Sequence, residues 1–178
     1  FTMEVIMKLI IQQRPIAIDS ILQRLNNPQN NNGDVVFDVM DEARNAHGLI
    51  KKFHHMGAQE YCAYDNKGDM IIKVHRDSMH FPPTCDAATT NGILGTVTRN
   101  MTFGTLDYEV DFGGYTITGD AFGRAYRVEQ QGATIMQIRM DTPNLVKCYT
   151  IDLLGEIEEM TALALLMSID CLNDSKRR

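Results

Sequence analysis

Four histidines and one cysteine lie close enough in the sequence to suggest a metal site. Imidazole and thiolate are ligands that Zn²⁺ prefers, and the chain gathers His54, His55, His75, His80 and Cys85 in one stretch. None of their spacings is a zinc signature, and a pair of loop histidines with unrelated neighbours is the simpler interpretation. We therefore expect no metal ligands and no cofactor.

Other patterns that could carry chemistry are also better explained as structure. The segment GDAFGR at residues 119–124 is glycine-rich like a phosphate-binding loop, but it lacks the ending of such a loop and no helix follows, so we expect a turn. Glu156, Glu158 and Glu159 precede an apolar segment, where they favour the positive end of a helix over acid–base work. No serine or cysteine has a recognisable nucleophile setting. We expect no catalytic residue and a protein that is not an enzyme.

The basic residues indicate a binding surface. Residues 51–52 and 176–178 are the only compact basic groups, and the formal net charge of −6 argues against a general affinity for nucleic acid. We expect exposed loops at residues 26–33 and 51–55, and we take Lys51, Lys52, His54 and His55 as candidate binding residues. The alternative interpretation is that these are ordinary solvated side chains.

The elements that position these residues are mostly strands. Leu9 and Ile11 share one face of an opening strand, and a short helix with an Asn-rich loop is expected at about residues 15–33. Gly68 and Gly132 each mark a hairpin turn. Six further segments alternate between apolar and polar residues and are separated by turn formers, which predicts antiparallel hairpins: residues 34–40, 60–74, 92–103, 106–118, 125–140 and 146–154.

The segment EMTALALLMSIDCL at residues 159–172 predicts a helix without a polar face. It is shorter than the roughly twenty residues that cross a bilayer, so we expect no transmembrane span. The economical arrangement is a closed antiparallel β-barrel around this helix, with residues 1–178 as a single domain. The helix would fill the interior and leave no cavity, and we expect Asp170 to emerge at the barrel rim.

The C-terminal half carries a family resemblance. A strand with Tyr115 runs into Gly119, a hairpin with Tyr126 and Gly132 follows, and Tyr149 begins the last strand before the apolar helix. In these features the chain resembles the LURP-one-related family, which belongs with tubby C-terminal domains and phospholipid scramblases. The resemblance implies a tubby C-terminal-like barrel of about twelve antiparallel strands around a buried C-terminal helix, used for tethering and recognition. Residues 15–33 depart from the family's usual early hairpin, and no residue matches the basic residues with which tubby domains hold phosphoinositides.

Together these patterns predict a binding or regulatory barrel for a phospholipid head group or a protein partner. Two alternatives remain, a small-molecule enzyme with an unrecognised site and a scramblase-like membrane-associated protein. An enzyme would have a pocket ringed by titratable groups with perturbed pKa values. The four cysteines have no disulfide-framework spacing, so we expect a cytoplasmic protein, with peripheral association at the membrane as a further option.

Overall fold

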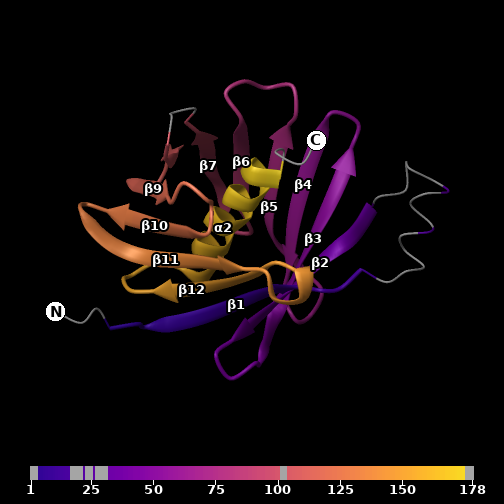
Figure 1. The fold of residues 1–178 in the computed structure, drawn as a ribbon, viewed down its shortest axis with the longest axis horizontal. Coiled ribbons are helices and arrows are strands. Elements are labelled where there is room, and N and C mark those ends of the chain that lie inside the picture. Colours follow the sequence, from indigo (N-terminus) through magenta and orange to yellow (C-terminus); the bar gives the residue numbers. More distant parts are fainter. Residues whose placement is uncertain (1–3, 17–21, 23–25, 27–31, 101–103, 175–178) are drawn as a thin grey trace.

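Twelve antiparallel strands form a closed barrel in the computed structural model, which describes residues 4–16, 22, 26, 32–100 and 104–174 (Figure 1). Each strand pairs with the next along the chain, and β1 closes the barrel by pairing with both β2 and β12. The strands are β1 (Met7–Gln13), β2 (Asn32–Asp41), β3 (Ala46–His55), β4 (Ala58–Tyr64), β5 (Met70–Asp77), β6 (Thr84–Thr89), β7 (Gly92–Arg99), β8 (Leu106–Val110), β9 (Tyr115–Gly119), β10 (Ala125–Gln130), β11 (Ala133–Asp141) and β12 (Cys148–Leu153). A short 3₁₀ helix, η1 (Pro143–Leu145), precedes β12.

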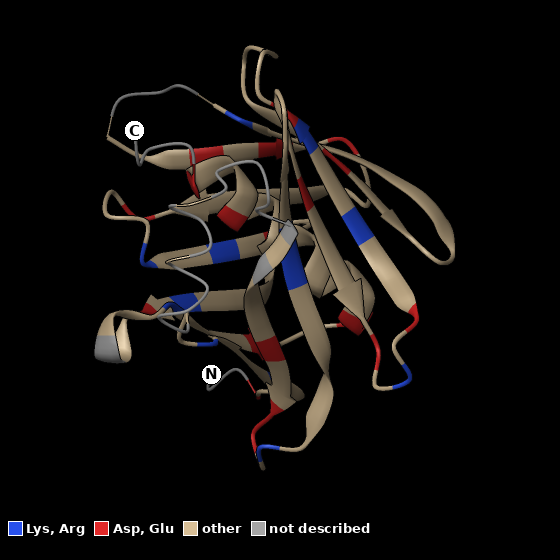
Figure 2. Cartoon of the chain, turned by 90° about the vertical axis from the view of Figure 1, so that its right-hand side faces the viewer, with Lys and Arg blue, Asp and Glu red and all other residues tan. Residues whose placement is uncertain are grey.

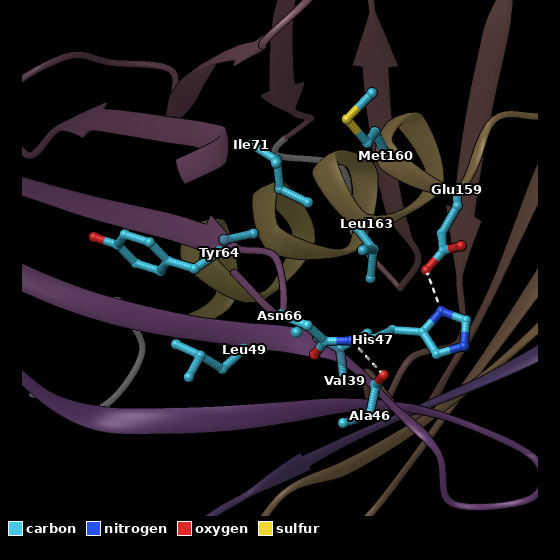
Figure 3. A pocket seen from close by; sticks show the side chains of 12 residues that line it. Val39, Ala46, His47, Leu49, Tyr64, Asn66, Ile71, Glu159, Met160 and Leu163 are labelled. Carbon is cyan, nitrogen blue, oxygen red and sulfur yellow. Dashed lines mark hydrogen bonds and ion pairs between the residues drawn. The ribbon is translucent and has the colours of Figure 1, made fainter. Parts of the chain in front are cut away.

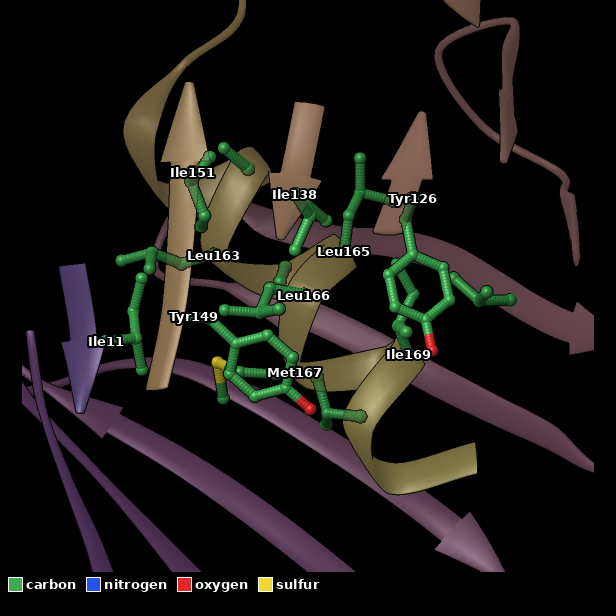
Figure 4. Close-up of a cluster of buried hydrophobic side chains, with 14 of the residues drawn as sticks. Ile11, Tyr126, Ile138, Tyr149, Ile151, Leu163, Leu165, Leu166, Met167 and Ile169 are labelled. Carbon is green, nitrogen blue, oxygen red and sulfur yellow. The ribbon is translucent and has the colours of Figure 1, made fainter. Parts of the chain in front are cut away.

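Helix α2 (Glu159–Asn173) runs through the middle of this barrel, where Figure 1 shows it in yellow. Every residue from Ala162 to Leu172 is buried, as the absence of a polar face requires. Figure 4 shows Leu165, Leu166 and Ile169 of the helix among inward-facing side chains of the strands. The prediction of a barrel closed around the helix is therefore confirmed.

The alternation of the strands points their apolar side chains at the helix. Leu9 and Ile11 of β1 are buried, and they lie in register with Ile151 and Tyr149 of β12. The predicted turn glycine Gly68 has a φ of 87°, in the region that glycine adopts without strain. One face of each strand thus lines a common core.

Two expectations for the chain's first half are corrected. The stretch at residues 51–55 is not a loop, because it forms the second half of β3. The predicted Asn-rich loop ended at Gly33, but strand β2 already begins at Asn32. The rest of the helix and loop expected at residues 15–33 falls almost wholly outside the described residues.

The barrel has two unlike ends, which the antiparallel register defines. At the end where α2 finishes lie the connections at residues 56–57, 78–83, 120–124 and 142–147, and we call this the loop end. At the other end, which we call the mouth, lie the start of α2 and the turns at residues 42–45 and 65–69. Within the described part of the chain, no helix has the length and apolar character needed to cross a bilayer.

Candidate functional site

A buried ionic cluster surrounds Asp170, so its expected position at the solvent-exposed rim is wrong. The residue is only 3% exposed. Its carboxylate accepts hydrogen bonds from Lys52 Nζ at 2.7 Å, Lys147 Nζ at 2.8 Å and the hydroxyl groups of Tyr61 and Tyr149. Burial of a charge is tolerated when it is paired and hydrogen-bonded, and here both carboxylate oxygens have two donors.

The cluster also fixes the protonation states of its members. Burial opposes ionisation of Asp170, but the ammonium groups of Lys52 and Lys147 outweigh it and lower the pKa of the carboxyl. Burial alone would lower the pKa of Lys52, yet Asp170 and Asp174 raise it. Burial and the adjacent Asp170 carboxylate raise the pKa of Tyr61 far above its usual value. Asp170, Lys52 and Tyr61 therefore keep their ordinary charge at neutral pH, and they act together as an internal clamp.

Lys52 is therefore unsuited to the surface role expected of it. Its side chain is 4% exposed, and its ammonium contacts Asp170, Asp174 and the ring faces of Phe37 and Tyr61. The alternation of β3 turns Lys52 inward, whereas Lys51 points outward and lies 5.6 Å from the centre of the Tyr64 ring. Of the two candidate lysines, the structure leaves only Lys51 accessible.

The remaining histidine candidates do not come together as a metal site. His54 and His55 end β3, and His55 and His75 both face the carboxylate of Glu60. His80 lies in the loop at the loop end, where its Nδ1 is 3.0 Å from the carbonyl oxygen of Pro82. Cys85 is buried against the helix. Among the described residues, no three His, Cys, Asp or Glu side chains are placed to hold a metal ion.

The loop end presents large apolar side chains directly to solvent. Met56 in the β3–β4 turn is 98% exposed, and Met79 and Phe81 in the β5–β6 loop are 86% and 75% exposed. The two connections are neighbours, because the backbone N–H of Ser78 donates to the carbonyl of Gly57 at 2.8 Å. Exposed apolar residues are common singly, but several gathered on adjacent loops mark an interaction surface.

A pocket of about 370 Å³ opens at the mouth (Figure 3), contrary to the expectation that the helix would leave no cavity. We call it the mouth pocket. Its apolar wall comes from the first turns of α2 and the start of β5, and its polar rim from β3 and the β4–β5 turn. It is lined by Val39, Ala46, His47, Gly48, Leu49, Ala63, Tyr64, Asn66, Ile71, Glu159, Met160 and Leu163.

His47 is fixed between two carboxylates at the rim of the mouth pocket. Its Nδ1 lies 2.9 Å from Glu159, and its Nε2 lies 3.5 Å from Asp41. The hydrogen bond to Glu159 raises the pKa of His47, and hydrogen bonds from Asn45 lower the pKa of Asp41. With a carboxylate facing each ring nitrogen, the imidazole is favoured in its charged form and offers no free lone pair for general-base catalysis. The ion pair between His47 and Glu159 joins β3 to α2. The N-cap residue Glu158 makes no side-chain capping hydrogen bond.

Sequence reasoning missed both of these surfaces. His47 was not singled out because its partner Glu159 is 112 residues away in the chain. The sequence did hold an indication of the exposure of Met79 and Phe81, because they flank His80 in a short loop that ends in two prolines. Apolar residues in such a loop do not belong to the alternating strand positions that fill the core.

Comparisons with known proteins agree with the fold. A family model described as LURP-one-related matches residues 21–170. A crystal structure of a protein from Arabidopsis thaliana superimposes with a TM-score of 0.52 at 15% identity, and the match covers 96% of this chain and 92% of that one. At this identity the likeness concerns the fold alone. The search of curated proteins found no match. Because the family model spans most of the chain, the chain belongs to the LURP-one-related family.

Proposed function

We propose that this barrel is a non-enzymatic module that docks on phospholipid membranes through its loop end. The observation that carries the proposal is the group of Met56, Met79 and Phe81, each at least three-quarters exposed on two hydrogen-bonded connections. Phe122 and Leu145, 86% and 98% exposed, project from two other connections at the same end. Side chains on projecting loop tips fit a fluid bilayer interface better than a flat, rigid protein surface.

Charge around the loop end is compatible with this orientation. The connections at residues 56–57 and 78–83 contain no charged residue. Asp174, the last described residue of the chain, contacts Lys52 and Tyr61 near this end, and the sequence continues with Ser175, Lys176, Arg177 and Arg178. Basic residues next to a bilayer contribute about 1 kcal/mol each when the lipids are anionic.

The described residues on the side of the barrel turned toward the viewer in Figure 2 do not form a single basic face. Lysines and arginines alternate there with aspartates and glutamates. Between β1 and β2, Arg14 is bound to Asp38 at 2.6 Å. This mixed surface does not favour tight binding of a head group to the strands, so the proposal places the membrane contact on the loops instead.

The expected strength follows from the side chains that would enter the bilayer. Complete burial of a methionine or phenylalanine side chain stabilises by about 1.5–3 kcal/mol. Loss of Met79 or Phe81 should therefore weaken partitioning about tenfold or more, since 1.4 kcal/mol corresponds to a factor of ten. Three such side chains together would suffice for reversible peripheral binding.

The test is cosedimentation of the protein with vesicles of phosphatidylcholine, with or without phosphatidylserine. We expect binding to the mixed vesicles that weakens with salt, and loss of binding in the double variant Met79→Ser/Phe81→Ser. The matched control is Ile93→Ser, because Ile93 is equally exposed, at 89%, but lies at the mouth. Lys52 is not a useful site for a charge reversal, because a glutamate there would face Asp170 inside the barrel.

Two results would overturn the proposal. One is a lack of binding to either kind of vesicle, and the other is an equal loss of binding in the loop-end and mouth variants. Self-association through the loop end is the competing explanation for these exposed residues. It would appear as a dimer in sedimentation velocity that disappears in Met79→Ser/Phe81→Ser while vesicle binding is absent.

A further inference from the structure

The mouth pocket has the dimensions and lining of a binding site, and it lies at the opposite end of the barrel from the proposed membrane contact. Its volume of about 370 Å³ falls in the range of small-ligand and side-chain pockets. Its wall includes Ile71, Met160 and Leu163, which pack at the margin of the core, so the interior surface is apolar. Figure 3 shows these three side chains on one side of the pocket and His47 with Glu159 on another.

The pocket continues into a second hollow along the outer side of β3 and the β4–β5 turn. This hollow, of about 440 Å³, shares Leu49, Tyr64 and Asn66 with the mouth pocket. Its charged lining residues balance, two basic and two acidic: Arg14, Lys51, Asp38 and Asp65. The side-chain amide of Asn66 donates to the carbonyl of Ala46 at 2.7 Å and so fixes the turn against β3. The two hollows lie next to each other along β3, which leaves room beside the mouth pocket for an extended peptide segment.

Carboxylates outnumber cations around the mouth pocket. Among the described residues that line the pocket, His47 is the one basic side chain, and it lies between Asp41 and Glu159, which leaves a net negative charge at the rim. Glu42 and Glu158 flank these two carboxylates in the chain and are exposed.

The cations of the neighbouring turns do not balance this charge. Arg44 is directed away, because its guanidinium donates to Gln12 of β1 at 3.3 Å. Lys67 is exposed in the β4–β5 turn, but it is flanked there by Asp65 and Asp69. A phosphate or another anion would be repelled at the mouth.

We infer that the mouth pocket binds a basic segment of a partner protein, with one apolar side chain in the pocket and an adjacent lysine or arginine facing Glu159 and Asp41. Charge complementarity selects this occupant over an anionic lipid or an acidic peptide. The apolar wall supplies the anchor, and the carboxylates at the rim supply orientation and the preference for basic partners. The inference does not depend on membrane binding, because it concerns residues at the other end of the barrel.

The test uses two short fluorescent peptides that share a central leucine, one with arginines and one with glutamates on either side of it. Fluorescence polarisation should show binding of the arginine peptide and little binding of the glutamate peptide. Filling the pocket with Ala46→Phe should weaken binding about tenfold or more, as loss of an anchor site does. The matched control is Ala133→Phe, which places the same side chain on another exposed alanine at the mouth end, outside the pocket.

The contribution of charge is tested separately with Glu159→Lys, because Glu159 lines the pocket. This variant should weaken binding of the arginine peptide, whereas Glu109→Lys, an equal charge change on the exposed outer side of β8, should not. Equal affinity for the two peptides would overturn the inference, and so would full binding by Ala46→Phe. Because the assay contains no vesicles, its failure would leave the proposed membrane contact standing, and failure of the vesicle assay would leave this inference standing.

Discussion

The substitution Asp170→Asn should be among the most damaging single changes in this chain. The carboxylate of Asp170 accepts from two ammonium groups and two tyrosine hydroxyl groups. An asparagine keeps the volume but removes the charge, and it places an amide N–H₂ donor where one carboxylate oxygen had accepted two hydrogen bonds. Lys52 would stay buried with Asp174, at 3.3 Å, as its remaining carboxylate partner.

The magnitude follows from the cost of an unpaired buried charge. Removal of one partner from a buried ion pair costs about 3–5 kcal/mol, and because Asp174 remains beside Lys52 we expect a value near the lower end, about 3 kcal/mol. Domains of this kind have total stabilities of about 5–15 kcal/mol, so the variant should fold but unfold at a much lower urea concentration. The double variant Lys52→Met/Asp170→Asn should lose less stability than the two single losses added together.

Urea unfolding monitored by circular dichroism measures this effect, with Asp38→Asn as the control. Asp38 also binds a cation, Arg14, but its side chain is 37% exposed, so its loss should cost less than about 1 kcal/mol. If Asp170→Asn and Asp38→Asn lost similar stability, the cluster would not be the internal clamp described above.

Three further predictions concern the core, the mouth and a glycine of strand β3. Leu165→Lys should yield insoluble or unfolded protein in a solubility and circular dichroism assay, since an unpaired buried charge costs several kcal/mol; normal melting would place α2 outside the core. His47 should stabilise the fold fully below its ordinary pKa of about 6.5 and lose that contribution as pH rises through its raised pKa. The melting temperature of the wild type should therefore fall across this pH range, while that of His47→Asn stays constant. Gly48→Ala should lower the free energy of unfolding in urea by about 2 kcal/mol or more, because φ is 151° and a Cβ would overlap the Tyr64 carbonyl oxygen. In the control Gly92→Ala the added Cβ meets no neighbour, so the loss should be smaller, and equal losses would contradict this explanation.

The sequence predicted the elements whose patterns are local. An apolar helix without a polar face, such as the one around Leu165, requires burial on all sides, and alternation at Leu9 and Ile11 identified an inward strand face. Strand β3 was missed because its inward residue Lys52 is charged, so the apolar alternation is interrupted. That lysine is compensated by Asp170, more than a hundred residues later, and no local pattern reports such a pair.

The candidate surfaces were harder to predict because each depends on elements distant in the sequence. The mouth pocket needs β3 beside the start of α2, which only the closed barrel brings together. At the loop end, His54 and His55 are exposed, but Met56, which follows them in the chain, and Phe81 were not singled out as surface residues. Exposure of an apolar side chain is a property of the fold, and it becomes visible only when the strands have been placed.

The central claim is that the loop end, and not the mouth, enters the membrane. The chain contains no tryptophan, so one introduced at either end reports on its own surroundings. With vesicles of phosphatidylcholine and phosphatidylserine that carry brominated acyl chains, the fluorescence of Phe81→Trp should shift to the blue and be quenched, while that of Ile93→Trp should remain unchanged. Unchanged emission from Phe81→Trp in the presence of vesicles, or equal quenching in the two variants, would contradict the account.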